Sequence, residues 1–138
     1  MTHRVNTKWL NDLAFETDVS GHKIVMDADS DFGGEDRGPR PKMLVLSALG
    51  GCTGMDVIHI LNKMKIVPSY FNVTCEATLS DDELKRYNKV HVTYDFKADD
   101  NLDKRKVETA VKLSQDKYCS VSAMLKAGSE VTYEITYL

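Results

Sequence analysis

Hydrophobic and polar positions along this chain change their period several times, and each change predicts a new element. The first part consists of short runs in which polar and apolar residues alternate, separated by turn residues, as is typical of antiparallel strands. Residues 28–40 are rich in Asp, Gly and Pro and predict a loop. The three strands predicted before this loop cover residues 4–9, 13–19 and 23–27.

A single long helix is predicted after the loop. Residues 41–65 are mostly good helix formers, and Pro41 suits a first helical position. From Met43 to Leu49 the helix is apolar on nearly every side, which indicates a helix enclosed by protein. One sheet of a chain this short covers only one side of such a helix. We therefore expect a second subunit to cover the other side, in a homodimer.

The second half of the chain predicts more strands and two shorter helices. Residues 70–79 and 87–98 alternate between apolar and polar side chains, which predicts two strands with one buried face. Two helices and a final strand are then predicted at residues 102–117, 118–125 and 130–137. This order predicts an α+β fold with antiparallel sheets around a long central helix, as one domain over residues 1–138.

Composition and charge narrow the classes of function. The chain has 138 residues and a net charge of −3, so we expect no basic surface for nucleic acid or an anionic membrane. The central helix is interrupted by two glycines, Asp56 and His59, so no membrane span is predicted. The N-terminus shows no apolar signal segment, and three cysteines, an odd number, suit no disulfide scaffold. We expect a cytoplasmic protein in which any disulfide is transient.

Cys52 lies in the middle of the predicted helix, directly after Gly50 and Gly51. Each glycine costs about 1 kcal/mol of helix propensity relative to alanine. Two of them in succession indicate the close approach of another backbone or of a bound molecule near the sulfur. The plainer alternative is an inert core thiol, because free cysteine is among the most buried residue types. Cys75 falls on the apolar face of its strand and is expected to be core.

Asp56 and His59 raise the question of a metal or a Cys–His dyad. Cys52 and Asp56 are four residues apart and share a helix face. His59 lies about 10 Å along the axis from Cys52, which excludes a dyad on this helix. Zinc would need a third ligand that no Cys or His spacing supplies, so we expect no metal and no cofactor. Asp56 and His59 are expected to face a partner helix or solvent. The residues expected to fill gaps in the core are Met43, Met55, Met64 and Met124.

The residues around two of the cysteines carry a family resemblance. The segment ALGGCTGMD around Cys52 and the segment LSQDKYCSV around Cys119 resemble the OsmC/Ohr superfamily of osmotically inducible and organic-hydroperoxide-resistance proteins. The resemblance covers nearly the whole chain, including the order of elements. It implies an intertwined homodimer with active sites at the subunit interface.

The resemblance also implies a thiol-dependent peroxidase that acts on organic hydroperoxides. Cys52 matches the thiol that peroxide oxidises to a sulfenic acid, and Cys119 matches the thiol that resolves it as a disulfide, which an external thiol reductant then reduces. The residues agree with this chemistry, because a sulfenic acid must meet a second thiol before it is oxidised irreversibly. Cys119 begins a predicted helix, where the dipole and free amides favour a thiolate.

The sequence departs from the peroxidase branch of this superfamily at two positions. That branch has a Glu near the start of the central helix, where this chain has Lys42 or Met43, and an Arg in the early strands, whereas no Arg lies around Asn11 and Asp12. Cys52 is mid-helix and receives little help from the helix dipole, so its thiolate needs a nearby cation. The candidates for that cation are Arg37, Arg40 and Lys42.

The sequence therefore leaves two functions open. The first is the peroxidase, for which an apolar surrounding of Cys52 favours alkyl hydroperoxides, because each buried methylene contributes about 0.8 kcal/mol. The second is a non-enzymatic OsmC-like stress protein that binds a small apolar ligand at the dimer interface. The missing Glu and Arg favour the second function.

Overall fold

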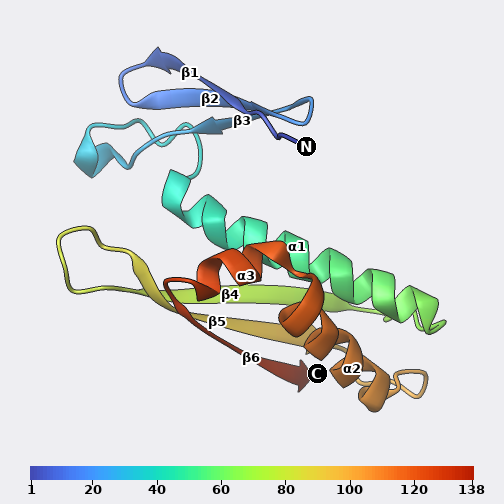
Figure 1. Cartoon of the computed structure of the whole chain (residues 1–138). Coiled ribbons are helices and arrows are strands. Elements are labelled where there is room, and N and C mark those ends of the chain that lie inside the picture. The colour runs from blue at the N-terminus through green and yellow to red at the C-terminus, as the bar shows by residue number, and fades with distance from the viewer. The chain divides into compact units, whose positions relative to one another are not determined.

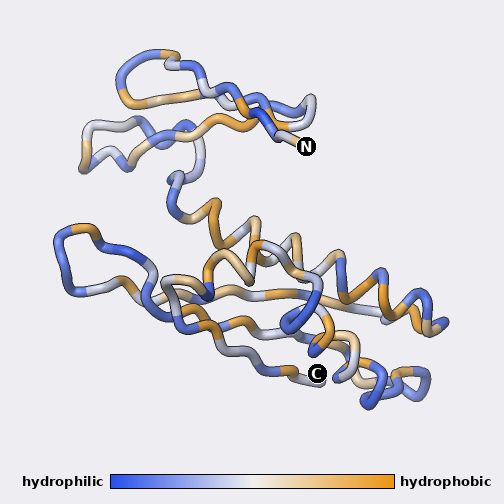
Figure 2. Tube along the Cα trace, in the orientation of Figure 1, coloured by the Kyte–Doolittle hydropathy of each residue, from blue (hydrophilic) through white to orange (hydrophobic).

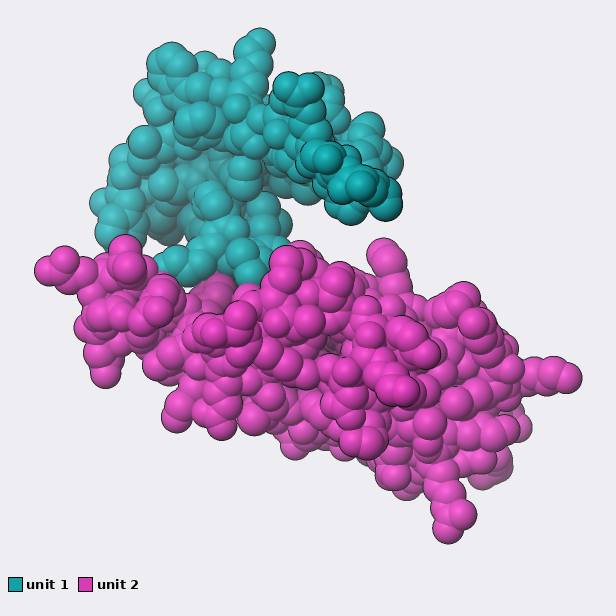
Figure 3. Space-filling model, viewed as in Figure 1, with its two compact units in different colours: residues 1–45 teal, residues 46–138 magenta.

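The computed structural model describes all residues, 1–138, and they form two compact units (Figure 3). Residues 1–45 make up the N-terminal unit and residues 46–138 the C-terminal unit. The order of elements is three strands, a long helix, two strands, two helices joined by a π-helical turn, and a last strand. This order agrees with the one that the hydrophobic pattern predicts.

The N-terminal unit is a three-stranded antiparallel sheet in the order β1-β2-β3 (Figure 1). Its strands are β1 (Asn6–Asn11), β2 (Ala14–Val19) and β3 (His22–Met26). The turn between the second and third strands has Ser20 and Gly21 in the left-handed region, at φ 45° and 83°. Glycine adopts this conformation at no steric cost, which explains why the chain turns there.

The loop after β3 is organised by the carboxylate of Asp27, which is buried. This carboxylate accepts hydrogen bonds from the backbone amides of Ala28, Glu35 and Arg37, and from the Arg37 guanidinium at 2.9 Å. A Cβ at residue 34 would lie 2.0 Å from the carbonyl oxygen of Ala28, so glycine is required there. The loop also contains a single turn of 3-10 helix, η1 (Ser30–Phe32).

The C-terminal unit is built on a second three-stranded sheet, in the order β4-β5-β6. Strands β4 (Phe71–Leu79) and β5 (Tyr87–Phe96) form the predicted antiparallel hairpin, but β6 (Glu130–Tyr137) runs parallel to β5. The prediction of purely antiparallel sheets is therefore wrong for this pair. The intervening helices carry the chain back to the end of the sheet at which β5 began, and a strand that starts there must run parallel.

All of the helices of the C-terminal unit cover one face of this sheet (Figure 1). They are α1 (Pro41–Lys63, from Leu46 onward in this unit), α2 (Lys104–Leu113), the π-helical turn η2 (Ser114–Tyr118) and α3 (Ser120–Lys126). The opposite face of the sheet carries polar residues. The core between helices and sheet includes Leu49, Val57, Leu61, Val90, Val92, Tyr94, Phe96, Val107, Ala110 and Val111, all of which are buried.

Helix α1 carries apolar residues along most of its length (Figure 2), and Met43, Val45 and Met55 among them are exposed. Only Leu49, Thr53, Val57 and Leu61 of this helix are buried. The helix is long and apolar enough to cross a membrane by length and composition, a test that core helices of soluble proteins also pass. The prediction that the methionines fill the core is wrong for three of them, because one chain covers only one side of these helices. The three exposed members of that predicted set are Met43, Met55 and Met124.

Candidate thiol site

The structure brings Cys52 and Cys119 together, although they are far apart in the sequence. The two Sγ atoms and a carboxylate oxygen of Asp56 all lie within 4.8 Å of one another. Both thiols are free, Cys52 half-buried on α1 and Cys119 buried just before α3. Asp56, which was expected to face a partner helix or solvent, is instead a third member of this group, whereas His59 is exposed.

The glycines around Cys52 allow α1 to lie close to β4. A Cβ at residue 50 would be 3.6 Å from Cys75 Sγ, and one at residue 54 would be 3.6 Å from a methyl group of Val73. Gly51 points away from the sheet, where a Cβ would meet nothing within 4 Å. The close approach expected from the glycine pair is therefore made by Gly50 within this chain, and Gly51 leaves the outer side of the helix open.

The π-helical turn between α2 and α3 positions Cys119. Its wider turn places Ser114 in the interior, and the backbone amide of Cys119 donates to the carbonyl of Ser114 at 2.8 Å. Turns of this type are frequently found at functional sites. The Cys119 Sγ then accepts a hydrogen bond from the backbone amide of Ser122 at 3.4 Å, as the N-cap of α3.

The Cys119 thiol does not have the low pKa that its place before a helix suggested. Burial raises its pKa to about 11, and the neighbouring Cys52 and Asp56 act in the same direction. The amide of Ser122 acts in the opposite direction but is outweighed. Desolvation disfavours the thiolate more strongly than one turn of helix favours it. At neutral pH this sulfur is therefore a protonated thiol.

A chain of buried hydroxyl groups leads to Asp56 from the core. Ser114 Oγ donates to Asp56 Oδ2 at 3.0 Å, so its one hydrogen is used and it must accept from Thr53 Oγ1, 2.7 Å away. Thr53 in turn accepts from the Tyr94 hydroxyl at 2.6 Å, and Tyr94 accepts from the Gln115 side-chain amide at 2.6 Å. Every donor in this series therefore points toward the Asp56 carboxylate.

The largest influences on the pKa of Cys119 are burial, the Ser122 amide, Cys52 and Asp56, and none of these is a cation. Lys112, at the end of α2, pairs with Asp116 at 2.8 Å, and Lys126 donates to the backbone carbonyl of Gln115. Both lysines are therefore bound to groups other than the two sulfurs.

The candidate cations Arg37 and Arg40 are engaged with acids of the N-terminal unit. Arg37 binds the buried Asp27 and also reaches the side chain of Asn11 and the carboxylate of Asp12. Burial alone would raise the pKa of Asp27, but the Arg37 guanidinium and the backbone amides outweigh it and hold that pKa well below its usual range. The sequence shows no arginine at positions 11 and 12, yet folding places a guanidinium beside them. Arg40 pairs with Asp36 and Asp29.

The structure also provides a third candidate metal ligand, which the spacing of Cys and His residues in the sequence did not indicate. Cys52, Asp56 and Cys119 could each offer one ligand atom to a single ion. Two thiolates and a carboxylate suit zinc, with a fourth position left open. The raised pKa of Cys119 works against such a site, because a metal binds the thiolate.

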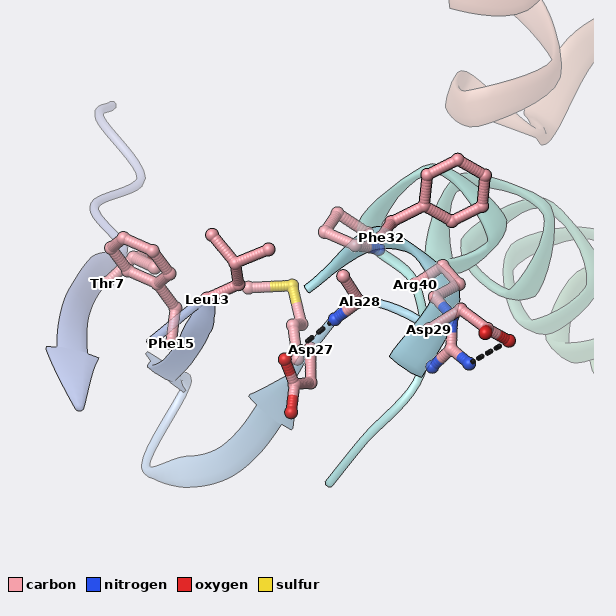
Figure 4. Close-up of a pocket in the computed structure, with 10 residues that line it drawn as sticks. Thr7, Leu13, Phe15, Asp27, Ala28, Asp29, Phe32 and Arg40 are labelled. Carbon is pink, nitrogen blue, oxygen red and sulfur yellow. Dashed lines mark hydrogen bonds and ion pairs between the residues drawn. The ribbon is translucent and has the colours of Figure 1, made fainter. Parts of the chain in front are cut away.

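The N-terminal unit contains a hollow of about 550 Å³ (Figure 4). Its lining is mostly apolar and includes Leu13, Phe15 and Phe32, whose side chains are exposed. The ion pair between Arg40 and Asp29 lies among the lining residues. The volume and character of this hollow match those of small-molecule sites.

The sequence and structure comparisons with known proteins agree on one family. The sequence profile described as OsmC-like protein matches residues 33–134. The chain is 34% identical to protein YhfA of Escherichia coli K12 over 134 residues, which cover 94% of each chain. Its structure is similar to that of a hypothetical protein from Aquifex aeolicus, with a TM-score of 0.83, 26% identity and coverage of 100% and 98%. It is also similar to the organic hydroperoxide resistance protein OhrB of Bacillus subtilis, with a TM-score of 0.67, 16% identity and coverage of 98% of each chain.

Proposed function

Because this chain belongs to the OsmC-like protein family, we propose that it is a thiol-dependent peroxidase that reduces organic hydroperoxides. The family and the hydroperoxide-resistance neighbours support a redox or stress-related role. The observation that carries the finer proposal is the approach of the Cys52 and Cys119 sulfurs to within 4.8 Å. We take the two compact units as one OsmC-like domain of a cytoplasmic protein.

The reaction has two steps on the enzyme. The Cys52 thiolate attacks the terminal oxygen of the hydroperoxide, the O–O bond breaks, and the oxygen with its hydrogen passes to the sulfur. The alkoxide takes up a proton equivalent to the one that the thiol lost on ionising, and it leaves as an alcohol. Cys52 is then a sulfenic acid. The Cys119 sulfur attacks it, a Cys52–Cys119 disulfide forms, and the oxygen leaves as water. An external thiol reductant supplies the two electrons that restore both thiols.

The candidates for the cation that favours the Cys52 thiolate remain Arg37, Arg40 and Lys42. The Arg37 guanidinium reaches Asn11 and Asp12, the positions around which the peroxidase branch carries its arginine.

The first test is peroxide consumption by the reduced protein. We expect the wild-type protein to consume about one equivalent of an alkyl hydroperoxide per chain. Cys52→Ser should lose this reaction by at least about a hundredfold, because burial raises the pKa of both remaining thiols, Cys75 and Cys119, and disfavours the reactive thiolate. The measurement is a stoichiometric peroxide assay without reductant. Cys75→Ser is the matched control, since Cys75 packs against α1 and should change nothing. Equal consumption by Cys52→Ser would exclude the proposal.

We further propose that the protein is a homodimer in which α1 packs on a second copy. The outer side of α1 is apolar and exposed, with Met55 at 76% exposure and Gly51 open to close approach. Met55→Asp is expected to shift the protein from dimer to monomer, because a charge in a buried interface has no partner. Sedimentation at micromolar concentration measures this shift. Asn62→Asp adds a negative charge at another exposed position of the same helix and should leave the dimer intact, whereas loss of the dimer in both variants would argue against this interface.

The second candidate function is a non-enzymatic OsmC-like stress protein that binds a small apolar ligand at the dimer interface. The hollow of about 550 Å³ with its apolar lining favours it. The absence of a cation among the largest influences on the pKa of Cys119 points the same way. If this function holds, mild oxidation will form no Cys52–Cys119 disulfide, and Cys52→Ser will not differ from the wild type in peroxide consumption.

A further inference from the structure

We infer that Asp56 is the proton acceptor for the Cys119 thiol when the Cys52–Cys119 disulfide forms. This inference rests on the proposed function for its physiological setting, but its chemistry applies to any disulfide exchange between the two sulfurs. The carboxylate lies within 4.8 Å of both Sγ atoms. No other carboxylate belongs to this group.

The need for a base follows from the environment of Cys119. Cys119 is buried and its pKa is raised to about 11, so its sulfur is a protonated thiol at pH 7. The thiolate is the nucleophile, so the attack on Cys52 requires that the Cys119 proton be removed. The titratable groups that face Cys119 are Cys52 and Asp56 on α1 and Tyr94 on β5. Of these, only Asp56 has a carboxylate, whose oxygens can accept a proton.

The series of buried hydroxyl groups from the core holds the Asp56 carboxylate in place. Ser114 donates to Oδ2, and Thr53 and Tyr94 continue the series behind Ser114. Because Ser114, Thr53 and Tyr94 all point their hydrogens toward Asp56, this series presents the carboxylate with a donor. Ser114 is therefore a positioning residue, which fixes the carboxylate beside the two sulfurs.

The step is balanced without any further reactant. The Cys119 S–H proton passes to the Asp56 carboxylate while the Cys119 sulfur bonds to Cys52 and the S–O bond of the sulfenic acid breaks. The departing hydroxide takes the proton from Asp56 and leaves as water. Asp56 returns to its carboxylate form, ready for the next cycle.

The experiment follows disulfide formation in two ways. In the first, the reduced protein reacts with one equivalent of cumene hydroperoxide, and sulfenic acid and disulfide are followed separately by dimedone trapping and by non-reducing mass analysis. In the second, an aromatic disulfide that releases a coloured thiolate replaces the peroxide. Cys52 releases the first coloured thiolate, and attack by Cys119 on the mixed disulfide releases the second, so this arm requires no peroxidase activity.

Asp56→Asn retains the size of the side chain and an oxygen that accepts from Ser114. We expect it to slow disulfide formation and the second release about a hundredfold at pH 7, the usual contribution of a general base. The rate should then rise about tenfold per pH unit between pH 7 and 9, as Cys119 ionises by itself. In Asp56→Ala, added acetate or formate should restore part of the rate. Asp116→Asn is the matched control, because Asp116 is exposed and paired with Lys112.

A purely electrostatic or structural role gives the opposite result. Asp56 raises the pKa of Cys119, so removing its charge would by itself give more thiolate and a faster second release. A second release in Asp56→Asn that equals or exceeds the wild-type rate would overturn the inference, as would the lack of any rescue by acetate in a folded Asp56→Ala. If sulfenic acid never forms but the second release shows the expected loss, the peroxidase proposal fails and the inference about Asp56 stands.

Discussion

Cys119→Ser is expected to leave the first reduction of hydroperoxide unchanged and to remove the route by which the enzyme recovers. The variant still has Cys52, so it should consume about one equivalent of peroxide at the wild-type rate. Its sulfenic acid then lacks the thiol that lies within 4.8 Å in the wild type, because Cys75 does not belong to the close group of Cys52, Asp56 and Cys119. Excess hydroperoxide should convert the sulfenic acid to the sulfinic acid, which is not reversible by thiols.

The measurement for Cys119→Ser combines mass analysis with turnover. Intact-mass spectra should show one and then two added oxygens, where the wild type shows only the disulfide. Turnover with a dithiol reductant and excess cumene hydroperoxide should fall at least about tenfold and end in irreversible inactivation. Cys75→Ser should behave as the wild type. A Cys119→Ser protein that survives excess peroxide with undiminished turnover would show that Cys119 is not the resolving thiol.

Tyr94→Phe should give a large loss of stability for the removal of a single atom. The Tyr94 hydroxyl is buried and lies 2.6 Å from both Thr53 Oγ1 and Gln115 Nε2. Without it, the Gln115 amide has no acceptor in the core and Thr53 loses its donor. A buried polar group left without a partner costs about 1–3 kcal/mol, so the free energy of unfolding should fall by that amount.

Urea unfolding at pH 7 measures this loss, and Tyr133→Phe is its control. Tyr133 packs edge-on against Tyr94 at 6.1 Å but is 39% exposed, so its hydroxyl can bond to water. We expect a change within about 0.5 kcal/mol for Tyr133→Phe. Equal losses in both variants would mean that the hydroxyl chain contributes no specific stability. The same Tyr94→Phe protein should also form the Cys52–Cys119 disulfide more slowly, because the series of hydroxyl groups that begins at Tyr94 ends on Asp56.

Much of the fold could be predicted from the sequence. The strands, the long helix from Pro41 and the two later helices follow from the local period of apolar residues, and the α+β fold is confirmed. The OsmC/Ohr resemblance is confirmed by the family profile over residues 33–134. The parallel pairing of β5 and β6 was not predicted, because strand direction depends on where the intervening helices return the chain.

The two thiols could be named from the sequence, but their chemistry could not be. The segments around Cys52 and Cys119 carry the family resemblance. Cys52 lies on helix α1, and Cys119 directly precedes helix α3. Only the tertiary structure decides that Asp56 joins them, that Cys119 is buried with a raised pKa, and that Arg37 reaches Asn11 and Asp12. The physical reason is that periodicity is a local property of the chain, whereas desolvation and charge proximity arise from segments that meet only on folding. The sequence therefore determined the elements and the candidate sulfurs, and the packing of α1 against β4, β5 and the π-helical turn decided what surrounds them.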